Sequence, residues 1–566
     1  MNVCPKCKTV ISDKNAQYCL ECGAPVERKA GSNKLWIITG VVGSLVLIAG
    51  LLLLLRGFIG TGSRAAAMAP AETDMFFTIN PNLEQVNNFK RIKDIYLEIP
   101  EVKRAIDDLK QELKDDFSLD FEADIKPWLG RELAVVVPYI ESPNPFDDEN
   151  AFLFAIATKD VKKTAACMEQ LRRHEEEERS SYFSRKTYEG VEIYVEPDVS
   201  PPVVYAITKG FLLLSNDEGL VCSTIDRLKR KNKETLIKNE KYKEVLAKLP
   251  KSRAGMVYLD HDYLNRVVSS DGGGDAGKIS QIEAANALGV SLSFVSEGIR
   301  VDYALDCDLE KLPQYEGETK RTSDTLQRLI EITPAGVLAC TGSTGLKSIL
   351  RDLAEHEDME YFERDTGIYF EQDILSWMSG EGTVALLPDR DGLLGESDVP
   401  IGILAMIGTK DSQTARSALN KILDILQDEG GEVTSDTIGS FDVHYLVEPY
   451  KEEVIAGYGI RGNVVVIGSS ENVLRQALEG RGEHLDNDAA FKKAGAGLSF
   501  PGDDCLYINV EKGVNWARNS LRGYQLEEFN RTVYPYLRPI STITMASHKP
   551  GEKDSFTTGA LLINVK

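Results

Sequence analysis

Four cysteines near the start of the chain have the residue type and spacing of a metal site. They form two Cys-x-x-Cys pairs separated by eleven residues: Cys4, Cys7, Cys19 and Cys22. Thiolates are the soft ligands that Zn²⁺ prefers, and two such turns supply the corners of a tetrahedron. Two disulfides or a redox-active pair are the alternatives. The spacing favours one structural zinc ion, bound in a zinc ribbon over residues 1–27.

A run of 21 uncharged residues follows at 35–55, after a short basic linker at 28–34. As a helix this run is roughly 31 Å long, which matches a hydrocarbon core of about 30 Å. Trp36 lies at its edge, where an amphipathic ring favours the membrane interface. We therefore predict a transmembrane helix; a cleaved signal peptide and a buried core helix are the alternatives.

The charges and thiols around this run predict its orientation. Basic residues are slightly more numerous before the run than after it, and cytoplasmic flanks carry the excess of Lys and Arg. Zinc-bound thiolates also persist in a reducing cytosol. We expect a single-pass protein of the cell membrane, with the N-terminus cytoplasmic and the C-terminal part outside.

The large C-terminal part is strongly acidic. The chain has 65 basic and 88 acidic residues, and residues 1–64 hold eight and three of them, so 57 and 85 remain, a net charge of −28. This balance argues against nucleic acid or anionic lipid as a partner. The five cysteines of this part are an odd number, spread over more than 300 residues, so they form no disulfide framework. Some 500 residues are too many for one core.

An internal repeat divides this part into two units. The pattern Asp-Ile-x-x-Trp-x-x-x-Glu occurs at 124–132 and again at 373–381, an offset of 249 residues. Thr-Lys-Asp at 158–160 recurs in the same order at 409–411. A repeat of this length is a duplicated domain, because solenoid repeats have periods of 20–50 residues. We predict a linker at 56–69, a first unit at 70–320 and a second unit at 321–566.

The hydrophobic pattern within a unit alternates between helical and strand periods. Apolar residues at three- and four-residue steps predict helices near 86–92, 102–117, 161–173, 217–230 and 239–248. Short β-rich runs between and after them predict strands, and tight turns such as Lys209-Gly210 predict hairpins. The fold class is therefore α+β, with mainly antiparallel sheets.

Two segments resemble known bacterial proteins. Residues 3–25 are similar to the short zinc ribbons that open many bacterial membrane proteins. Pro70-Ala71 before a strand that ends at Asn80-Pro81, together with the repeated Trp pattern, resembles a bacterial envelope family known only as a domain of unknown function. The resemblance implies a large extracytoplasmic domain behind one membrane anchor. It implies no activity.

No catalytic centre is predicted. Asp124 and Glu132, with Asp373 and Glu381, could be acid–base pairs, but capping and packing explain them better. The sequence has no phosphate loop, no Gly-x-Ser-x-Gly and no His-Glu-x-x-His motif. We expect Asp124 and Asp373 to cap a short helix, Trp128 and Trp377 to pack on it, and the run of glutamates from 175 to 178 to be solvated.

Three functions fit these observations. The first, which we favour, is an envelope protein that binds a ligand or partner, or acts as a scaffold, through its duplicated domain. The second is an extracytoplasmic hydrolase whose site is assembled from distant residues. The third is a transmembrane sensor that uses the zinc ribbon as a cytosolic docking module. A polar cleft with clustered acids or histidines would favour the enzyme, and an apolar surface would favour the binding protein.

Overall fold

The computed structural model describes residues 2–3, 10–11, 63–142, 149–179, 182–196, 201–229, 234–270, 284–311, 323–354, 357–390, 400–428, 430–448, 453–480, 483–550 and 554–566. Before residue 63 these include only the antiparallel pair β1 (Asn2–Val3) and β2 (Val10–Ile11). The four predicted zinc ligands and the predicted transmembrane helix lie outside the described residues. Among the described helices, none has both the length and the apolar character to cross a bilayer.

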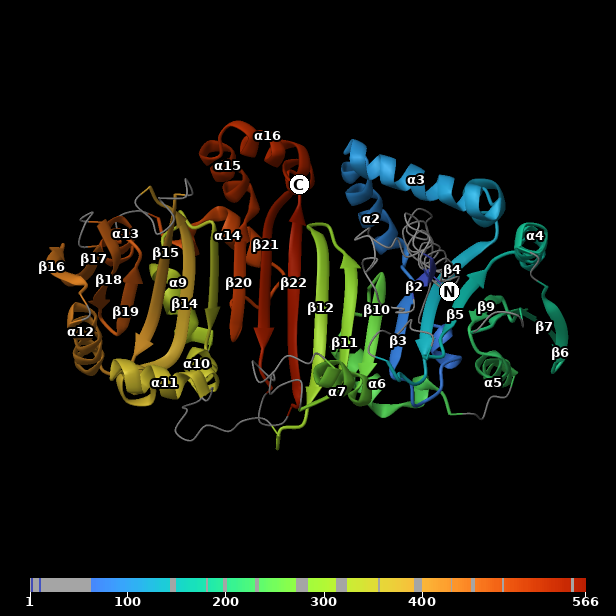
Figure 1. Cartoon of the computed structure of the whole chain (residues 1–566), viewed down its shortest axis with the longest axis horizontal. Coiled ribbons are helices and arrows are strands. Elements are labelled where there is room, and N and C mark those ends of the chain that lie inside the picture. The colour runs from blue at the N-terminus through green and yellow to red at the C-terminus, as the bar shows by residue number, and fades with distance from the viewer. Residues whose placement is uncertain are drawn as a thin grey trace.

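The prediction of an α+β fold with antiparallel strands is confirmed. A single sheet of 20 strands extends along the long axis of the molecule (Figure 1). The part before residue 320 contributes β3 (Met75–Ile79), β4 (Leu129–Val137), β5 (Leu153–Thr158), β6 (Ser184–Tyr188), β7 (Val191–Glu196), β8 (Val203–Thr208), β9 (Phe211–Ser215), β10 (Gly255–Asp260), β11 (Ala285–Phe294) and β12 (Gly298–Cys307). The remainder contributes β13 (Ala339–Ser343), β14 (Met378–Pro388), β15 (Ile401–Thr409), β16 (Glu432–Ile438), β17 (Phe441–Glu448), β18 (Glu453–Arg461), β19 (Val464–Gly468), β20 (Asp504–Asn509), β21 (Ile540–His548) and β22 (Phe556–Val565).

The strands follow the same order in both parts of the chain. In the first part, pairing runs β6-β7-β8-β9-β5-β4-β3-β10-β11-β12. In the second part it runs β16-β17-β18-β19-β15-β14-β13-β20-β21-β22. The last strands of the two parts, β12 and β22, pair antiparallel and join them into one sheet. The sequence analysis did not foresee this joint.

Helices cover one face of the sheet along its length, lie at both ends of its strands, and cover the other face near its two outer parts. The first part contains η1 (Ala65–Ala67), α2 (Leu83–Tyr96), α3 (Pro100–Phe117), the π-helical turn η2 (Phe121–Ile125), α4 (Val161–Arg179), α5 (Glu218–Lys229), η3 (Leu236–Lys238), α6 (Glu240–Lys248) and α7 (His261–Ser270). The second part contains α9 (Ser323–Ile332), α10 (Leu346–Ala354), α11 (Glu357–Thr366), the π-helical turn η4 (Phe370–Leu375), α12 (Ser412–Asp428), α13 (Glu471–Glu479), η6 (Leu485–Asn487), α14 (Ala489–Gly495), α15 (Val510–Ser520), α16 (Gly523–Thr532) and α17 (Tyr534–Leu537).

Local sequence signals explain most of these boundaries. Pro100 occupies the first turn of α3, where its missing N–H costs no hydrogen bond. Asp160 accepts a hydrogen bond from the Lys163 N–H at 3.1 Å and so caps α4. The predicted Lys209-Gly210 turn connects β8 to β9, and both residues have positive φ angles. This turn gives the hairpin the backbone twist that its strands need.

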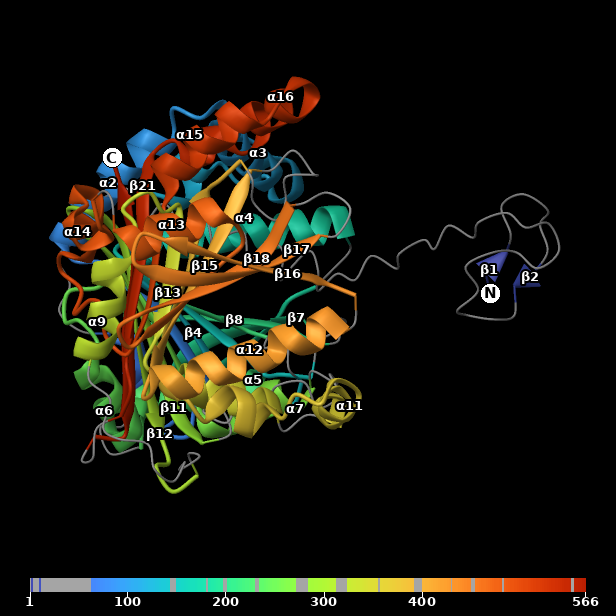
Figure 2. The same cartoon turned by 90° about the vertical axis from the view of Figure 1, so that its left-hand side faces the viewer.

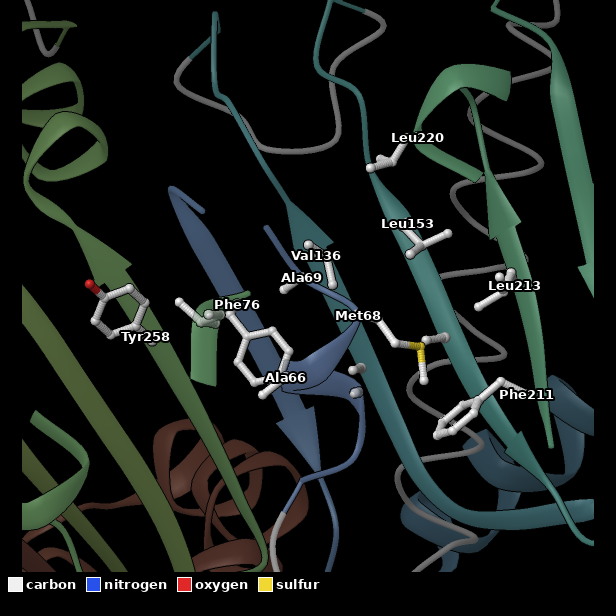
Figure 3. Close-up of a cluster of buried hydrophobic side chains, with 14 of the residues drawn as sticks. Ala66, Met68, Ala69, Phe76, Val136, Leu153, Phe211, Leu213, Leu220 and Tyr258 are labelled. Carbon is white, nitrogen blue, oxygen red and sulfur yellow. The ribbon is translucent and has the colours of Figure 1, made fainter. Parts of the chain in front are cut away.

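The main core lies between the sheet and the helices on one of its faces, which we call the covered face. In the first part, side chains of β3, β4, β5, β9 and β10 pack against η1, α5 and α6, as Figure 3 shows for Phe76, Val136, Leu153, Leu220 and Tyr258. In the second part, α9, α13 and α14 bury the equivalent face. Figure 2 shows α6, α9 and α14 together on this side of the sheet.

The end of the predicted linker belongs to this core. Residues 63–69 fall within the linker that the sequence analysis places at 56–69, yet Ala65 and Met68 are fully buried. Figure 3 shows Ala66, Met68 and Ala69 beside the strands. The small side chains of this segment suit a tight turn packed against a sheet. They resemble a flexible linker in composition alone, which is why the sequence analysis extended the linker too far.

Candidate functional site

The opposite face of the sheet is apolar over its central strands, and among the described residues only α2 packs on it there, at Phe294 and Ile299. We call it the open face. We define it by two rows of paired residues, each of which crosses neighbouring strands in the order β11, β12, β22, β21, β20, β13, β14 and β15. The first row is Leu292, Val301, Leu561, Met545, Leu506, Thr341, Val384 and Ala405. The second row is Phe294, Ile299, Ile563, Ile543, Ile508, Ala339, Leu386 and Ile403. Only Thr341 in these rows is polar.

Most side chains of the two rows reach solvent. Val384 is 42% exposed, Leu292 37% and Ile403 36%, and the others, except the buried Phe294, are half-buried or exposed. Figure 1 views this face, with α2, α3, α15 and α16 beyond one end of the strands and α7, α10 and α11 beyond the other. Figure 2 shows the same helices in profile. A contiguous exposed apolar surface of this kind marks a binding site.

The central strands reverse the polarity that an antiparallel sheet normally has. A solvated sheet turns its polar side chains to water and its apolar side chains to the core. Here the apolar Val301 and Leu561 are on the open face. Their neighbours on the covered face include the buried polar residues Ser291, Asp302, Thr544 and Asn564. The pairing register decides which side chains of a strand face each side of the sheet, since a shift by one residue exchanges the two faces. The outward apolar side chains therefore follow from the register of all the central strands and not from a single residue.

A third row of the open face leads from the central strands into the first part of the chain. It runs from Tyr303 through the paired residues Val290, Val257, Phe77, Val135, Phe154, Leu214 and Tyr205. Beyond Phe77 this row is buried or half-buried. Val135 and Phe154 pack in a cluster with Ile140 and Phe152, and Leu214 and Tyr205 pack with residues of α3, η2 and α4. The row ends at a cavity beneath those helices.

The cavity has a volume of about 120 Å³ and lies between α3, α4 and the strands β4, β5, β8 and β9. Its walls are almost entirely apolar, and they include Leu113, Phe117, Ile125, Leu129, Met168, Leu212 and Leu214. The lining residues with polar atoms are Trp128, Cys167, Arg172, Glu175, Glu196 and Tyr205. Glu175 therefore lies at the cavity, although the sequence predicts only a solvated helix end there.

Two side-chain donors are buried at this cavity. The indole N–H of Trp128, whose side chain is 4% exposed, is hydrogen-bonded to the Cys167 sulfur. Nε of Arg172 has no acceptor in the part of the chain that the structure describes. The Arg172 guanidinium forms ion pairs with Glu169 and Glu176 through its other nitrogens. Burial raises the pKa of the neighbouring Cys167 thiol to about 11, so the thiol is neutral at physiological pH. Unpaired buried donors are unusual in proteins and call for an explanation.

The corresponding tryptophan of the second part is satisfied. Trp377 donates its indole N–H to the carbonyl of Asp373 at 2.9 Å. It is 3% exposed and packs against Leu375, Met378, Ala415 and Ala418. Both tryptophans precede the second strand of their part, and their carbonyls accept equivalent bonds from Thr158 and Thr409. The two sites thus share a scaffold and differ at the indole N–H.

The acidic residues of the repeated pattern have structural roles. Asp124 accepts the Asp120 N–H at 2.8 Å, and Asp373 accepts the Tyr369 N–H at 2.8 Å, so both cap the π-helical turn, as the sequence predicts. Glu132 is 3% exposed and accepts the backbone N–H of Ala65 at 3.0 Å. It anchors the start of the described core.

Three aspartates form a second polar cluster. One carboxylate oxygen from each of Asp74, Asp260 and Asp262 lies within 4.8 Å of the others. Burial raises the pKa of Asp74 to about 6, despite a hydrogen bond from the Ile140 N–H at 2.8 Å. Arg266 Nη1 is 3.9 Å from Asp74 and partly balances the cluster. Clusters of carboxylates are common on protein surfaces without a bound cation, so this cluster is not assigned as a metal site. Because the pKa of Asp74 is raised, the cluster should make the stability of the fold depend on pH.

One serine–histidine pair has hydrogen-bond geometry. Ser435 Oγ is 2.9 Å from His444 Nδ1, on the paired strands β16 and β17. His444 stacks on Tyr458, and burial lowers the pKa of its imidazole. Among the described residues, no carboxylate makes a hydrogen bond to this imidazole that would orient it as a base. The pair lies at the far edge of the sheet, away from the cavity and the open face.

The comparisons with known proteins identify a family for this chain. The family model described as "Protein of unknown function (DUF3352)" matches residues 35–565. The chain belongs to the DUF3352 family. No curated protein matches this DUF3352 chain. Its solved-structure matches include crystal forms I and III of TP0453, at 10% and 9% identity, covering 48% and 44% of this chain and 85% and 83% of that one. Their TM-scores are 0.24 and 0.25.

Sequence reasoning missed the open face of this DUF3352 chain and the cavity, although it placed Trp128 correctly as a packed residue. The alternation of apolar and polar residues in 299–306 predicts a strand with two unlike faces. It does not predict which face the helices cover. The one signal available was that several of the polar partners are Ser, Thr and Asn, short uncharged residues that are buried more readily than Lys or Glu.

Proposed function

We propose that this chain is a membrane-anchored envelope protein that binds the acyl chains of membrane lipids on the open face of its sheet. The observation that carries the proposal is the reversed polarity of the central strands. Half-buried Val301, Leu561 and Met545 face outward, while Asp302 and Thr544 are buried behind them. Burying polar side chains while leaving apolar ones exposed lowers stability in water. A surface that binds hydrocarbon explains the arrangement.

The position of the chain relative to a bilayer favours lipid as the occupant. If residues 35–55 form the anchor, only residues 56–62 separate Leu55 from the described core at Ser63. Seven extended residues reach at most roughly 25 Å. The sheet is then held close to a bilayer, whose acyl chains lie just beneath the head groups. The net charge of −28 outside the anchor segment favours neutral over anionic head groups.

The proposal includes the topology that the sequence predicts. The zinc ribbon at 1–27, with Cys4, Cys7, Cys19 and Cys22, lies in the cytoplasm, and the two units at 70–320 and 321–566 lie outside. The equal strand order in the two parts supports a duplication. Two related units joined edge to edge make one long face, which suits a long ligand better than either unit alone would.

Photo-crosslinking tests this function. The full chain is reconstituted in phosphatidylcholine vesicles that contain a lipid with a photoreactive group in its acyl chain, and cross-linked peptides are mapped by mass spectrometry. We expect cross-links in β11, β14, β21 and β22. The triple variant Leu292→Glu, Val384→Glu, Ile403→Glu places charges on the open face and should lose them. Ile237→Glu is the matched control, because Ile237 is 43% exposed but lies in η3 on the covered side.

Other outcomes would contradict the proposal. Cross-links confined to residues 35–55, and unchanged in the triple variant, would show that lipid contacts the anchor alone. A dimer that the triple variant converts to a monomer, with no cross-links to the sheet, would show that the face binds a second copy of the chain.

A further inference from the structure

We infer that a cavity on the covered face of the first part binds the phosphate group of a phosphate ester. The cavity has a volume of about 430 Å³ and lies at the end of β3 and the start of β10, beside η1, η3 and α6. It is on the other side of the sheet from the open face, and its ligand carries a charge that acyl chains lack. The inference therefore goes beyond the proposed function and does not rest on it.

The charged side chains that line this cavity are basic. They are Lys243 of α6, and Lys251 and Arg253 of the loop that leads into β10. Among the described lining residues none is acidic. Lys243 pairs on the surface with Glu240, whereas Lys251 and Arg253 have no carboxylate partner in the part of the chain that the structure describes. Because the chain outside residues 1–64 has a net charge of −28, three cations around one cavity are a local exception that favours an anion.

Buried hydrogen-bond donors also line the cavity. Thr78 of β3 is 4% exposed, and its hydroxyl has no partner among the described residues. Tyr242 of α6 is equally buried, and burial raises the pKa of its phenol to about 12, so the hydroxyl keeps its proton and can donate a hydrogen bond. Within the described residues, Arg253 hydrogen-bonds only to the Pro250 carbonyl, at 2.8 Å. A phosphate group offers several acceptor oxygens to such donors at once.

One buried carboxylate nearby does not neutralise the cavity. Glu132 lies close enough to Tyr242 to raise the pKa of its phenol, but it is not a lining residue. Its oxygens accept hydrogen bonds from residues 63–65, which stabilise its charge. Burial lowers the pKa of the Arg253 guanidinium, because this cation loses hydration without gaining a carboxylate. A bound anion would compensate for that loss.

The second part of the chain has apolar residues in the equivalent place. The strand register and the repeat offset of 249 residues define four counterparts: Gly342 for Thr78, Phe491 for Tyr242, Phe500 for Lys251 and Gly502 for Arg253. The rings of Phe491 and Phe500 pack edge to face, with centroids 5.2 Å apart. The shared fold therefore forms without the polar residues of the cavity, which points to a ligand as the reason for them in the first part.

The size of the cavity favours an ester over a free phosphate ion. Its volume is within the range of ~300–1,000 Å³ that is usual for pockets of small organic ligands. Ala66, Leu246 and Met256 provide apolar wall for the organic part of the ester. A soluble phosphate ester and a phospholipid head group share this chemistry, and the experiment below distinguishes them.

Isothermal titration calorimetry of the full chain in micelles of an uncharged detergent tests the site, with glycerol 3-phosphate as the probe. We expect one saturable site per chain. Arg253→Gln and Lys251→Gln should each weaken binding by roughly tenfold or more, since each removes a charge-assisted contact. Lys492→Gln is the matched control, because Lys492 takes the place of Lys243 in the second part, on α14, and it should leave the affinity unchanged.

Two further variants separate binding from folding. Thr78→Val removes the unpartnered hydroxyl, so it should weaken binding about threefold to tenfold while the urea midpoint without ligand stays equal or rises. Lys251→Phe introduces the aromatic residue of the second part and should abolish binding in a folded chain. The probe should raise the urea midpoint of the unmodified chain and not that of Lys251→Phe. Unchanged affinity in both variants would overturn the inference.

Other probes identify the class and source of the anion. Acetate should bind roughly tenfold more weakly than glycerol 3-phosphate, and equal affinities would overturn the assignment to phosphate. The chain is also titrated in phosphatidylcholine vesicles with and without phosphatidic acid. A lower affinity in the presence of phosphatidic acid assigns the site to a phospholipid head group, and an unchanged affinity assigns it to a soluble ester; both support the inference. Absence of binding in micelles and vesicles alike would overturn it and would leave the cross-links on the open face unaffected.

Discussion

Val301 of β12 pairs with Leu561 of β22, and this pair lies at the joint where the two parts of the chain become one sheet. Both side chains are on the open face and both are half-buried. The joint thus builds the centre of the proposed lipid-binding surface from the last strands of the two parts. Neither part forms this surface without the other.

Gly298→Ala should weaken this joint. Gly298 has a φ angle of 156°, and a Cβ atom there would lie 2.0 Å from the carbonyl oxygen of Ile563 on β22. We expect a loss of roughly 1–3 kcal/mol in the free energy of unfolding, measured by urea denaturation. Gly513→Ala in α15 is the control, because no atom lies within 4 Å of its added Cβ. An unchanged urea midpoint for Gly298→Ala would show that the strands adjust without cost.

Glu132→Gln should loosen the start of the folded core. The Glu132 carboxylate accepts the Ser63 hydroxyl at 2.5 Å and the backbone N–H groups of Arg64 at 3.1 Å and Ala65 at 3.0 Å. The amide of Gln turns an N–H group toward one of these donors, which costs roughly 1–3 kcal/mol. Trypsin should cut after Arg64 faster than in the unmodified chain.

A surface variant controls for the loss of charge. Glu122→Gln removes a carboxylate that is 53% exposed and paired with Lys126 on the surface, and surface ion pairs contribute little. Its cleavage rate should match that of the unmodified chain. If both variants behave alike, the anchoring role of Glu132 is wrong.

Asp74 should make stability fall as the pH rises through about 6. Burial raises its pKa from the ordinary 3.8 to about 6, so the folded state holds this proton more tightly than the unfolded state. The resulting stability is complete below pH 4 and is lost as the pH rises through 6. We expect about 1–2 kcal/mol, less than the full pKa difference implies, because solvent screens part of the site.

The comparison of variants isolates this effect from other titrating groups. Asp74→Asn keeps an oxygen acceptor for the Ile140 N–H and removes the titration. Urea denaturation at pH 4.5 and 7.5 should show a smaller decrease for Asp74→Asn than for the unmodified chain. Asp262→Asn, at an exposed position of the same cluster, should keep most of the decrease. Parallel pH profiles for the unmodified chain and Asp74→Asn would rule out the assignment.

The full chain should contain one zinc ion, held by the four N-terminal cysteines. Cys19→Ser removes one thiolate ligand, and we expect the zinc content, measured by atomic emission after dialysis, to fall toward zero. Cys222→Ser is the matched control, because Cys222 is a half-buried free cysteine of α5. Equal zinc content in both variants would exclude the proposed ribbon.

The sequence by itself determined the local elements and the repeat. Apolar steps of three and four residues placed α2, α3, α5 and α6, and short β-rich runs placed β7 to β12. The Asp124 cap and the Trp128 packing were also predictable, because capping and burial depend on residues close together in the chain. These signals are local, so no tertiary information was needed to find them.

Only the tertiary structure decided which face of the sheet is covered. The residues at 299–306 alternate in polarity, and either set of side chains could have packed against helices. Pairing of β12 with β22, some 260 residues apart, turns Val301 and Leu561 to the open face and Asp302 to the buried one. The cavity beneath α4 is likewise set by the packing of α4 against β8. Contacts between distant segments decide which face is covered and where the cavity lies. The alternation of side chains along a strand is the same for both faces of a sheet, so this pattern by itself does not tell which face the helices will cover.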